Sequence, residues 1–122
     1  MRIIPTRLHG AIDYLWGAAL LLAPRTLGLP PGSPEARVAQ TVGAGAIAYA
    51  AVTDYELGLV PVLTMRQHLA LDVVGGLALA ASPWLLGFAR RSGGPHLVFG
   101  LFAVAAGLLT REDPTDGPRA RR

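Results

Sequence analysis

Four long stretches of the sequence carry no Asp, Glu, Lys or Arg, and each is apolar and rich in small residues or Leu. They are residues 14–24, 38–53, 73–89 and 92–110. A helix needs about 20 apolar residues to cross the hydrocarbon of a bilayer. The first and third stretches reach that length only by extending back through Asp13 and His9, and through Asp72 and His68. The pattern therefore predicts an all-α protein, a bundle of four transmembrane helices with polar groups inside two of them.

The chain also repeats itself without gaps at an offset of 59 residues. Ten of the 23 positions from 7 to 29 are identical to their partners, where chance gives about two. Each unit predicts a helix, a turn with Pro and Gly, and a second helix. Two helices return the chain to its starting side, so we expect parallel tandem repeats related by a pseudo-two-fold axis along the membrane normal. The identical pairs include Arg7 with Arg66, His9 with His68, Asp13 with Asp72, Gly17 with Gly76 and Pro24 with Pro83.

The second helices match more weakly at the same offset, which pairs Ser33 with Ser92 and Asp54 with Asp113. We therefore expect repeats at about residues 7–54 and 66–113. Together they form a single membrane domain over residues 1–112, and residues 113–122 are a charged, flexible C-terminal tail. A soluble helical bundle is the alternative fold.

Composition supports the membrane class, because 52% of the residues are apolar and only 16% are charged, against about 25% charged in soluble domains. With no cysteine, thiol chemistry is excluded. All eleven basic residues are Arg, but they form no basic face with interleaved aromatics, so nucleic acid is not an expected partner. The expected partners are the lipid bilayer and, because Gly-rich helix faces pack closely, a second copy or another membrane protein.

The Arg residues favour one orientation. Seven flank the predicted spans on the side of the termini and four on the other side. The bias predicts that both termini are cytoplasmic, and we expect the cytoplasmic membrane of a prokaryote. The seven are Arg2, Arg7, Arg66, Arg111, Arg119, Arg121 and Arg122, and the four are Arg25, Arg37, Arg90 and Arg91.

The third predicted helix ends with the tripeptide Ser82-Pro83-Trp84, and the repeat keeps only Pro24 of it. With its repeat length and helix count, the chain resembles the SPW-repeat family of small integral membrane proteins. The resemblance covers all but the charged tail. It implies a membrane location with two transmembrane helices per repeat, and it implies no activity.

The polar residues that both copies share are the functional candidates, because charged groups inside spans are costly. The leading interpretation is structural. His and Asp at i and i+4 share a helix face, so we expect Asp13 to accept from His9 and Asp72 from His68. We also expect Asp54 and Asp113 to pair with Arg7 and Arg66. This buried Arg, His and Asp layer would serve a scaffolding or partner-binding membrane module.

A metal or haem site is one functional alternative. If the two-fold axis brings the first and third helices together, His9, Asp13, His68 and Asp72 converge as a ligand set for a divalent ion. His9 and His68 could instead hold a haem from both sides. The sequence does not decide which cofactor, if any, binds.

Proton or ion movement through the same His and Asp pairs is a second alternative. The far half of each span offers few hydrophilic steps for such a path. No nucleophile triad, phosphate loop or HExxH helix is present, so we name no catalytic residue and do not expect an enzyme. Trp84 and Tyr55, near opposite helix ends, are expected to be interfacial or packing aromatics.

Overall fold

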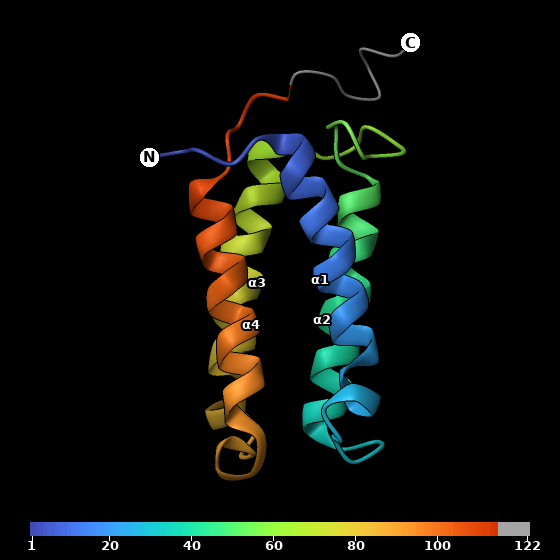
Figure 1. Ribbon diagram of the computed structural model, residues 1–122, viewed down its shortest axis with the longest axis vertical. Helices are drawn as coiled ribbons and strands as arrows, with labels where there is room; N and C mark the ends of the chain where they lie inside the picture. Colours follow the sequence, from blue (N-terminus) through green and yellow to red (C-terminus); the bar gives the residue numbers. More distant parts are fainter. Residues whose placement is uncertain (115–122) are drawn as a thin grey trace.

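The computed structural model describes residues 1–114 of the chain, and the predicted all-α class is confirmed (Figure 1). Four helices follow one another, and the described residues form isolated β-bridges but no strands. The predicted tail falls mostly on residues 115–122, outside the described part. The helices are α1 (Thr6–Thr26), α2 (Pro34–Ala51), α3 (Met65–Leu85) and α4 (Ala89–Leu109).

The helices form two hairpins, α1 with α2 and α3 with α4, and α2 packs against α3 between them (Figure 1). Both hairpins start and finish at the same end of the bundle, which we call the terminal end; the opposite end is the turn end. At the terminal end the N-terminal segment pairs with the chain that leaves α4. Ile3 N donates to Leu109 O over 2.7 Å, and Arg111 N donates to Ile4 O over 3.0 Å. The first and last helices are thereby tied together.

Local signals set the helix ends. α3 begins with a capping box, in which Thr64 accepts from Gln67 N and Gln67 accepts from Thr64 N, so two otherwise unpaired amides are satisfied. α1 and α3 end alike, because Gly28 and Gly87 have φ of +66° and +78°, a conformation that favours glycine after a helix. α4 begins at Ala89, three residues before the uncharged stretch 92–110, and bends at the non-helical Ser92.

Glycine lets the helices of each hairpin touch. A Cβ on Gly43 would lie 2.6 Å from Gly17 O, and a Cβ on Gly76 would lie 2.6 Å from Gly100 O. These matched contacts correct the repeat alignment of the second helices, whose offset is 57 and not 59. The reason is that Gly87 and Gly100 are two residues closer in the chain than Gly28 and Gly43. The equivalent pairs are Gly43 with Gly100, Ala46 with Ala103, Ala50 with Gly107 and Thr53 with Thr110.

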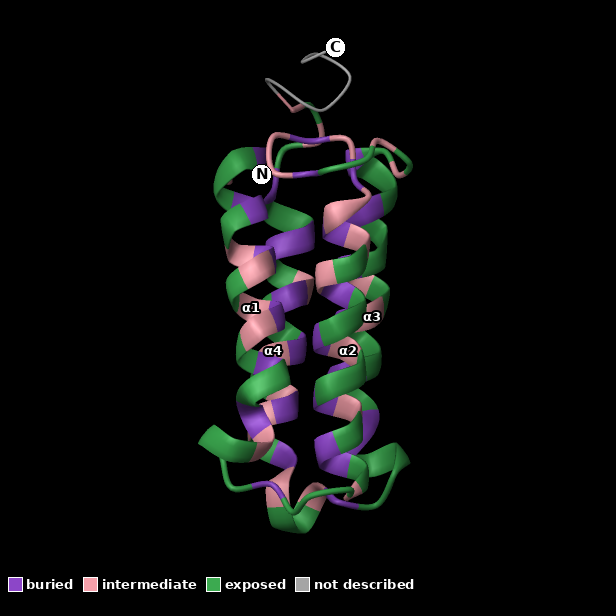
Figure 2. Ribbon diagram, turned by 90° about the vertical axis from the view of Figure 1, so that its right-hand side faces the viewer, coloured by how far each residue is buried: buried purple, intermediate pink, exposed green. Residues whose placement is uncertain are grey.

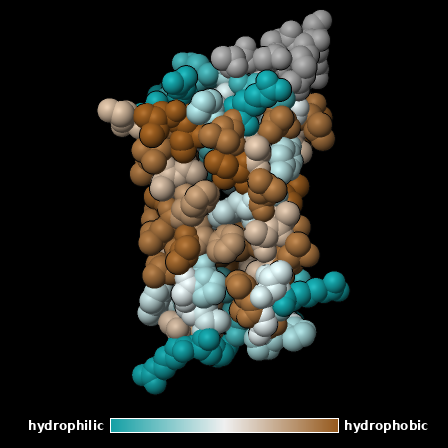
Figure 3. All heavy atoms as spheres, viewed as in Figure 1, coloured by the Kyte–Doolittle hydropathy of each residue, from teal (hydrophilic) through white to brown (hydrophobic). Residues whose placement is uncertain are grey.

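Many large apolar side chains are exposed, and most of the buried residues are small or polar. Figure 2 shows how exposed and buried residues alternate along each helix. Leu15 and Val74, in the middle of α1 and α3, are 72% and 66% exposed, whereas Ala50 and His68 are fully buried. Figure 3 shows the resulting apolar band between two hydrophilic ends. Of the four helices, α3 and α4 are long and apolar enough to cross a membrane. The same test does not select α1 and α2.

Candidate metal centre

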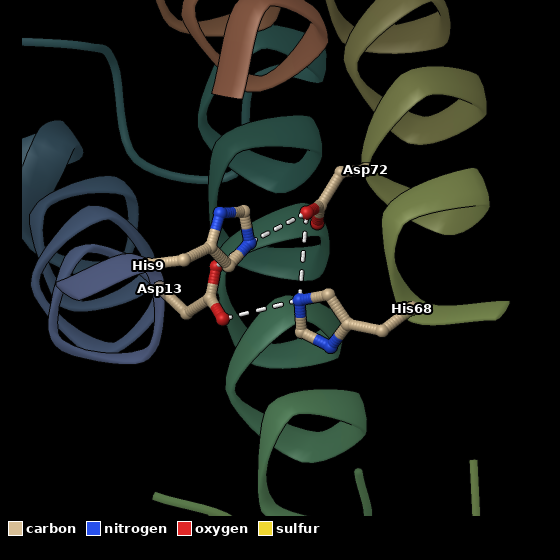
Figure 4. A group of neighbouring side chains, drawn as sticks. All are labelled: His9, Asp13, His68 and Asp72. Carbon is tan, nitrogen blue, oxygen red and sulfur yellow. Dashed lines mark hydrogen bonds and ion pairs between the residues drawn. The ribbon is translucent and has the colours of Figure 1, made fainter. Parts of the chain in front are cut away.

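Two turns into the bundle from the terminal end, four side chains meet between the hairpins (Figure 4). His9 and Asp13 lie one helical turn apart on α1, and His68 and Asp72 lie one turn apart on α3. Their four possible ligand atoms lie within 4.8 Å of one another, and all four residues are buried. The convergence expected from the two-fold arrangement is therefore present.

Each histidine contacts both aspartates. Nε2 of His9 lies 3.0 Å from Oδ1 of Asp13 and 2.9 Å from Oδ2 of Asp72. Nε2 of His68 lies 3.4 Å from Oδ2 of Asp72 and 3.1 Å from Oδ2 of Asp13. The expected pairs within one helix exist, but in both cases the contact with the other repeat is shorter.

A threonine of the opposite repeat orients each imidazole ring. Nδ1 of His9 lies 2.7 Å from Oγ1 of Thr110, and Nδ1 of His68 lies 2.8 Å from Oγ1 of Thr53. Each hydroxyl gives its only proton to the carbonyl four residues earlier, over 2.6 Å. The hydroxyl oxygen must therefore accept from Nδ1–H. This arrangement places the proton on Nδ1 and turns Nε2 of both rings toward the centre.

Two tyrosines hold the carboxylates in place. Tyr49 OH donates to Oδ1 of Asp72 over 2.5 Å, and Tyr55 OH donates to Oδ2 of Asp13 over 2.8 Å. Tyr55 comes from the loop between α2 and α3 and is completely buried, so of the two roles expected for it, interfacial or packing, the packing role applies. These tyrosines and the two threonines were not assigned to the cluster from the sequence. The equivalence of Thr53 and Thr110 was hidden because they align only at the offset of 57.

One nitrogen at the centre is unsatisfied. Nε2 of His68 is buried and makes no hydrogen bond of acceptable geometry with any described residue, although two carboxylate oxygens lie nearby. Buried polar atoms normally have a partner. A cation bound between this nitrogen and the two carboxylates would give the nitrogen a partner.

Comparison with known families adds one result. The SPW repeat domain matches residues 7–110, nearly the whole chain. The chain belongs to the SPW repeat family. Neither the curated proteins nor the solved structures gave a match. The family assignment and the two apolar helices are both consistent with a membrane location.

The tripeptide of this SPW repeat protein lies at the turn end, far along the helices from the histidines. Ser82 is buried and donates to Leu79 O over 2.7 Å, and Pro83 is buried beside it. Trp84 is 62% exposed. Pro24 occupies the equivalent place within α1. The tripeptide therefore shapes the end of a helix and contributes nothing to the His and Asp cluster.

The charged residues of the expected polar layer lie outside the cluster. Arg7 and Arg66 are exposed at the starts of α1 and α3, and Asp113 is exposed beyond α4. Asp54 is partly exposed after α2. Arg66 lies 3.6 Å from Glu112. The buried layer of this SPW repeat protein consists of His and Asp with hydroxyl partners, and the arginines stay in contact with solvent.

Proposed function

We propose that this SPW repeat protein is a small integral membrane protein that binds one divalent transition-metal ion between its two repeats. The observation that carries the proposal is the convergence of two Nε2 atoms and two carboxylates within 4.8 Å, all buried. The ligands would be His9, Asp13, His68 and Asp72.

Charge balance supports a cation at this place. Two aspartates bring two negative charges into a buried site, where uncompensated charge is costly. The threonines keep Nδ1 protonated, so a neutral ring would point the Nε2 lone pair at carboxylate oxygens 2.9–3.4 Å away. One divalent ion removes this repulsion and neutralises both carboxylates at once. Two protons, one on each Nε2, would be the metal-free equivalent.

The donor set indicates which ions fit. Imidazole nitrogen with carboxylate oxygen suits Zn²⁺, Fe²⁺, Mn²⁺ or Co²⁺, whereas Mg²⁺ and Ca²⁺ prefer oxygen alone. In a tetrahedral zinc site with bonds near 2.0 Å, neighbouring ligand atoms are about 3.3 Å apart. The nitrogen to oxygen distances of 2.9–3.4 Å are already close to this value. The Thr and Tyr partners supply the outer shell that metal ligands usually have.

Haem fits poorly in the same place. Two axial histidines must leave the plane between them free for the porphyrin. Here the carboxylates of Asp13 and Asp72 occupy that region, each within 3.4 Å of both Nε2 atoms.

A through-membrane ion path is not supported by the packing of the described residues. Beyond the cluster, toward the turn end, Gly17 and Gly76 bring the helix backbones together, and Leu20 and Leu79 are buried between them. The groove between α1 and α4 offers no hydrophilic route, because its lining is Ile12, Leu15, Trp16, Val98, Phe99 and Phe102. On this proposal the centre is a binding site and not a step in a path across the membrane.

The distribution of apolar residues supports four membrane spans with lipid as the surrounding partner. Large side chains such as Leu15, Val74 and Val98 face outward at mid-helix, and small residues fill the helix contacts, the arrangement that packing in lipid favours. On this proposal, the chain stays in the membrane fraction after extraction with alkaline carbonate. Release into the soluble fraction would contradict it.

The decisive experiment is metal titration of the full chain purified in mild detergent, followed by elemental analysis. We expect about one Zn²⁺ per chain and, with Co²⁺, the visible absorption of a tetrahedral site. His68→Gln should lower the affinity by about 100-fold or more, since even outer-shell changes cost 10–100-fold. His96→Gln is the matched control, because His96 is equally buried but bonds to Glu35 O at the other end.

A different result would reassign the cluster. If the native chain takes up none of the four ions, and His68→Gln is simply less stable, the His and Asp groups hold the two repeats in register and bind no metal. A Soret band on addition of haem that is lost in His68→Gln would favour the haem alternative.

A further inference from the structure

The turn end of the bundle is strongly basic. Among residues 1–114 its charged side chains are four arginines and a single acid, a net charge of +3. Over the same residues 1–114, the terminal end carries four arginines and four acids outside the His and Asp cluster. The turn-end residues are Arg25, Glu35, Arg37, Arg90 and Arg91, and the terminal-end residues are Arg2, Arg7, Asp54, Glu56, Arg66, Arg111, Glu112 and Asp113.

The single acid of the turn end is already bound within the protein. Glu35 is completely buried. Arg91 holds it in a two-point contact, with Nε 2.7 Å from Oε1 and the second guanidinium nitrogen 3.0 Å from Oε2. Arg25, Arg37 and Arg90 are exposed, and the turn end provides no second carboxylate for them. Their charge therefore faces outward.

Apolar and aromatic side chains stand next to these charges. Trp84 and Leu85 are 62% and 75% exposed, in the last turn of α3. A hollow of about 400 Å³ lies between Trp84 and the start of α4. It is lined by Pro83, Trp84, Gly87, Ala89, Arg90 and Arg91. In the space-filling view, hydrophilic side chains project from this end, directly beyond the apolar band (Figure 3).

We infer that the turn end binds anionic phospholipids, with Arg90 and its neighbours contacting the phosphate and Trp84 and Leu85 contacting the first part of an acyl chain. Guanidinium groups suit phosphate oxygens, and indole rings favour the boundary between head groups and hydrocarbon. A free phosphate ion would use the arginines alone, so the exposed apolar neighbours favour a lipid. The inference rests on the membrane location in the proposed function and does not depend on the metal.

The test uses fluorescence quenching of Trp84 by lipids with brominated acyl chains. Trp16→Phe leaves Trp84 as the sole tryptophan of the full chain. In mixed micelles, we expect brominated phosphatidylglycerol to quench at a several-fold lower mole fraction than brominated phosphatidylcholine. Arg90→Gln should raise the half-quenching fraction of phosphatidylglycerol by up to about fivefold, and removal of Arg25, Arg37 and Arg90 together should bring it to the value for phosphatidylcholine. Arg7→Gln, at the terminal end, is the matched control and should change nothing.

The opposite results are equally clear. Equal quenching by the two lipids, or equal effects of Arg90→Gln and Arg7→Gln, would overturn the inference. Full reversal by millimolar inorganic phosphate would identify a free-anion site instead. Carbonate extraction of the same protein tests the membrane location separately, and its metal content tests the centre, so a failure of the lipid inference can be told apart from a failure of either. Circular dichroism checks that every variant is folded.

Discussion

Nδ1 of His9 lies 2.7 Å from Oγ1 of Thr110, although 101 residues separate them in the chain. The bond joins the second turn of α1 to the residue that follows α4. Its counterpart joins His68 to Thr53 over 2.8 Å. Each repeat therefore supplies the hydroxyl that orients the histidine of the other repeat.

Replacement of Thr110 by Val should test this relationship. The change keeps the shape but removes the acceptor, so a buried N–H loses its partner at a cost of about 1–3 kcal/mol. On the metal proposal, Zn²⁺ affinity should also fall by about 10–100-fold, as measured by competition with a chromophoric chelator. Thr110→Ser should restore both properties. Thr41→Val, on an exposed part of α2, is the control, and equal behaviour of the two Val variants would contradict the assignment.

Tyr55→Phe should weaken metal binding by about tenfold, because the carboxylate of Asp13 loses the hydroxyl that orients it. Tyr14→Phe offers a matched control in the same region. Its hydroxyl donates to Leu57 O over 2.8 Å and does not touch the cluster. Zn²⁺ titration of both variants, with thermal unfolding alongside, separates loss of the site from loss of loop packing. Equal affinities would show that Tyr55 has only a packing role.

Neighbouring glycines on α3 should respond in opposite ways to alanine. A Cβ on Gly76 would lie 2.6 Å from Gly100 O, so Gly76→Ala must push two helices apart and should destabilise the fold by about 1–3 kcal/mol. Gly75 has open space around it. Gly75→Ala should therefore stabilise α3 slightly, by up to about 1 kcal/mol. Thermal unfolding in detergent gives the comparison, and a tolerated Gly76→Ala would argue against the close helix contact.

The pair Glu35 and Arg91 should make stability depend on acid pH. Glu35 lies before the uncharged stretch that begins at residue 38, and the Arg91 guanidinium lowers the pKa of its carboxyl from 4.5 to about 2. Because the folded state favours the carboxylate, the stabilisation is complete above pH 4.5 and is lost as the pH falls from there toward 2.

Thermal unfolding of the native chain and of Glu35→Gln should therefore differ most above pH 4.5, and the difference should shrink toward pH 2. Arg91→Gln should behave like Glu35→Gln. Arg25→Gln removes an exposed arginine from the same end and should keep the native pH profile. A constant difference between native chain and Glu35→Gln over this range would rule out the ion pair as its source.

The four helices and the pairing of the His and Asp residues could be predicted from the sequence. Uncharged stretches predicted four helices, and the offset of 59 aligned His9 with His68 and Asp13 with Asp72. Parallel repeats then required the two pairs to face each other. The threonines and tyrosines that contact the His and Asp cluster could not be predicted, for a physical reason. Thr53 and Thr110 follow turns of different length, so the shift in offset hid their equivalence, and a lone Thr or Tyr near a helix end has no pattern of its own.

Glu35 also escaped prediction, because a single carboxylate at a helix start is normally solvated and gives no sign of burial. Its contact with Arg91 depends on how α2 and α4 meet, which no local pattern encodes. The exposure of Arg7 and Arg66, in contrast, follows from local helix geometry. Their positions repeat with those of the histidines, but two residues along a helix turn a side chain by about 200°, away from the buried face.

The crossed bonds between repeats bear on how such a chain can arise and diverge. One hairpin alone holds a histidine and an aspartate, but its threonine points to a partner, so a single-hairpin ancestor would complete the centre only as a homodimer. Positions far from the axis differ between the two copies, as Arg25 and Trp84 do. A substitution at the axis, in contrast, removes a contact to a residue of the other copy.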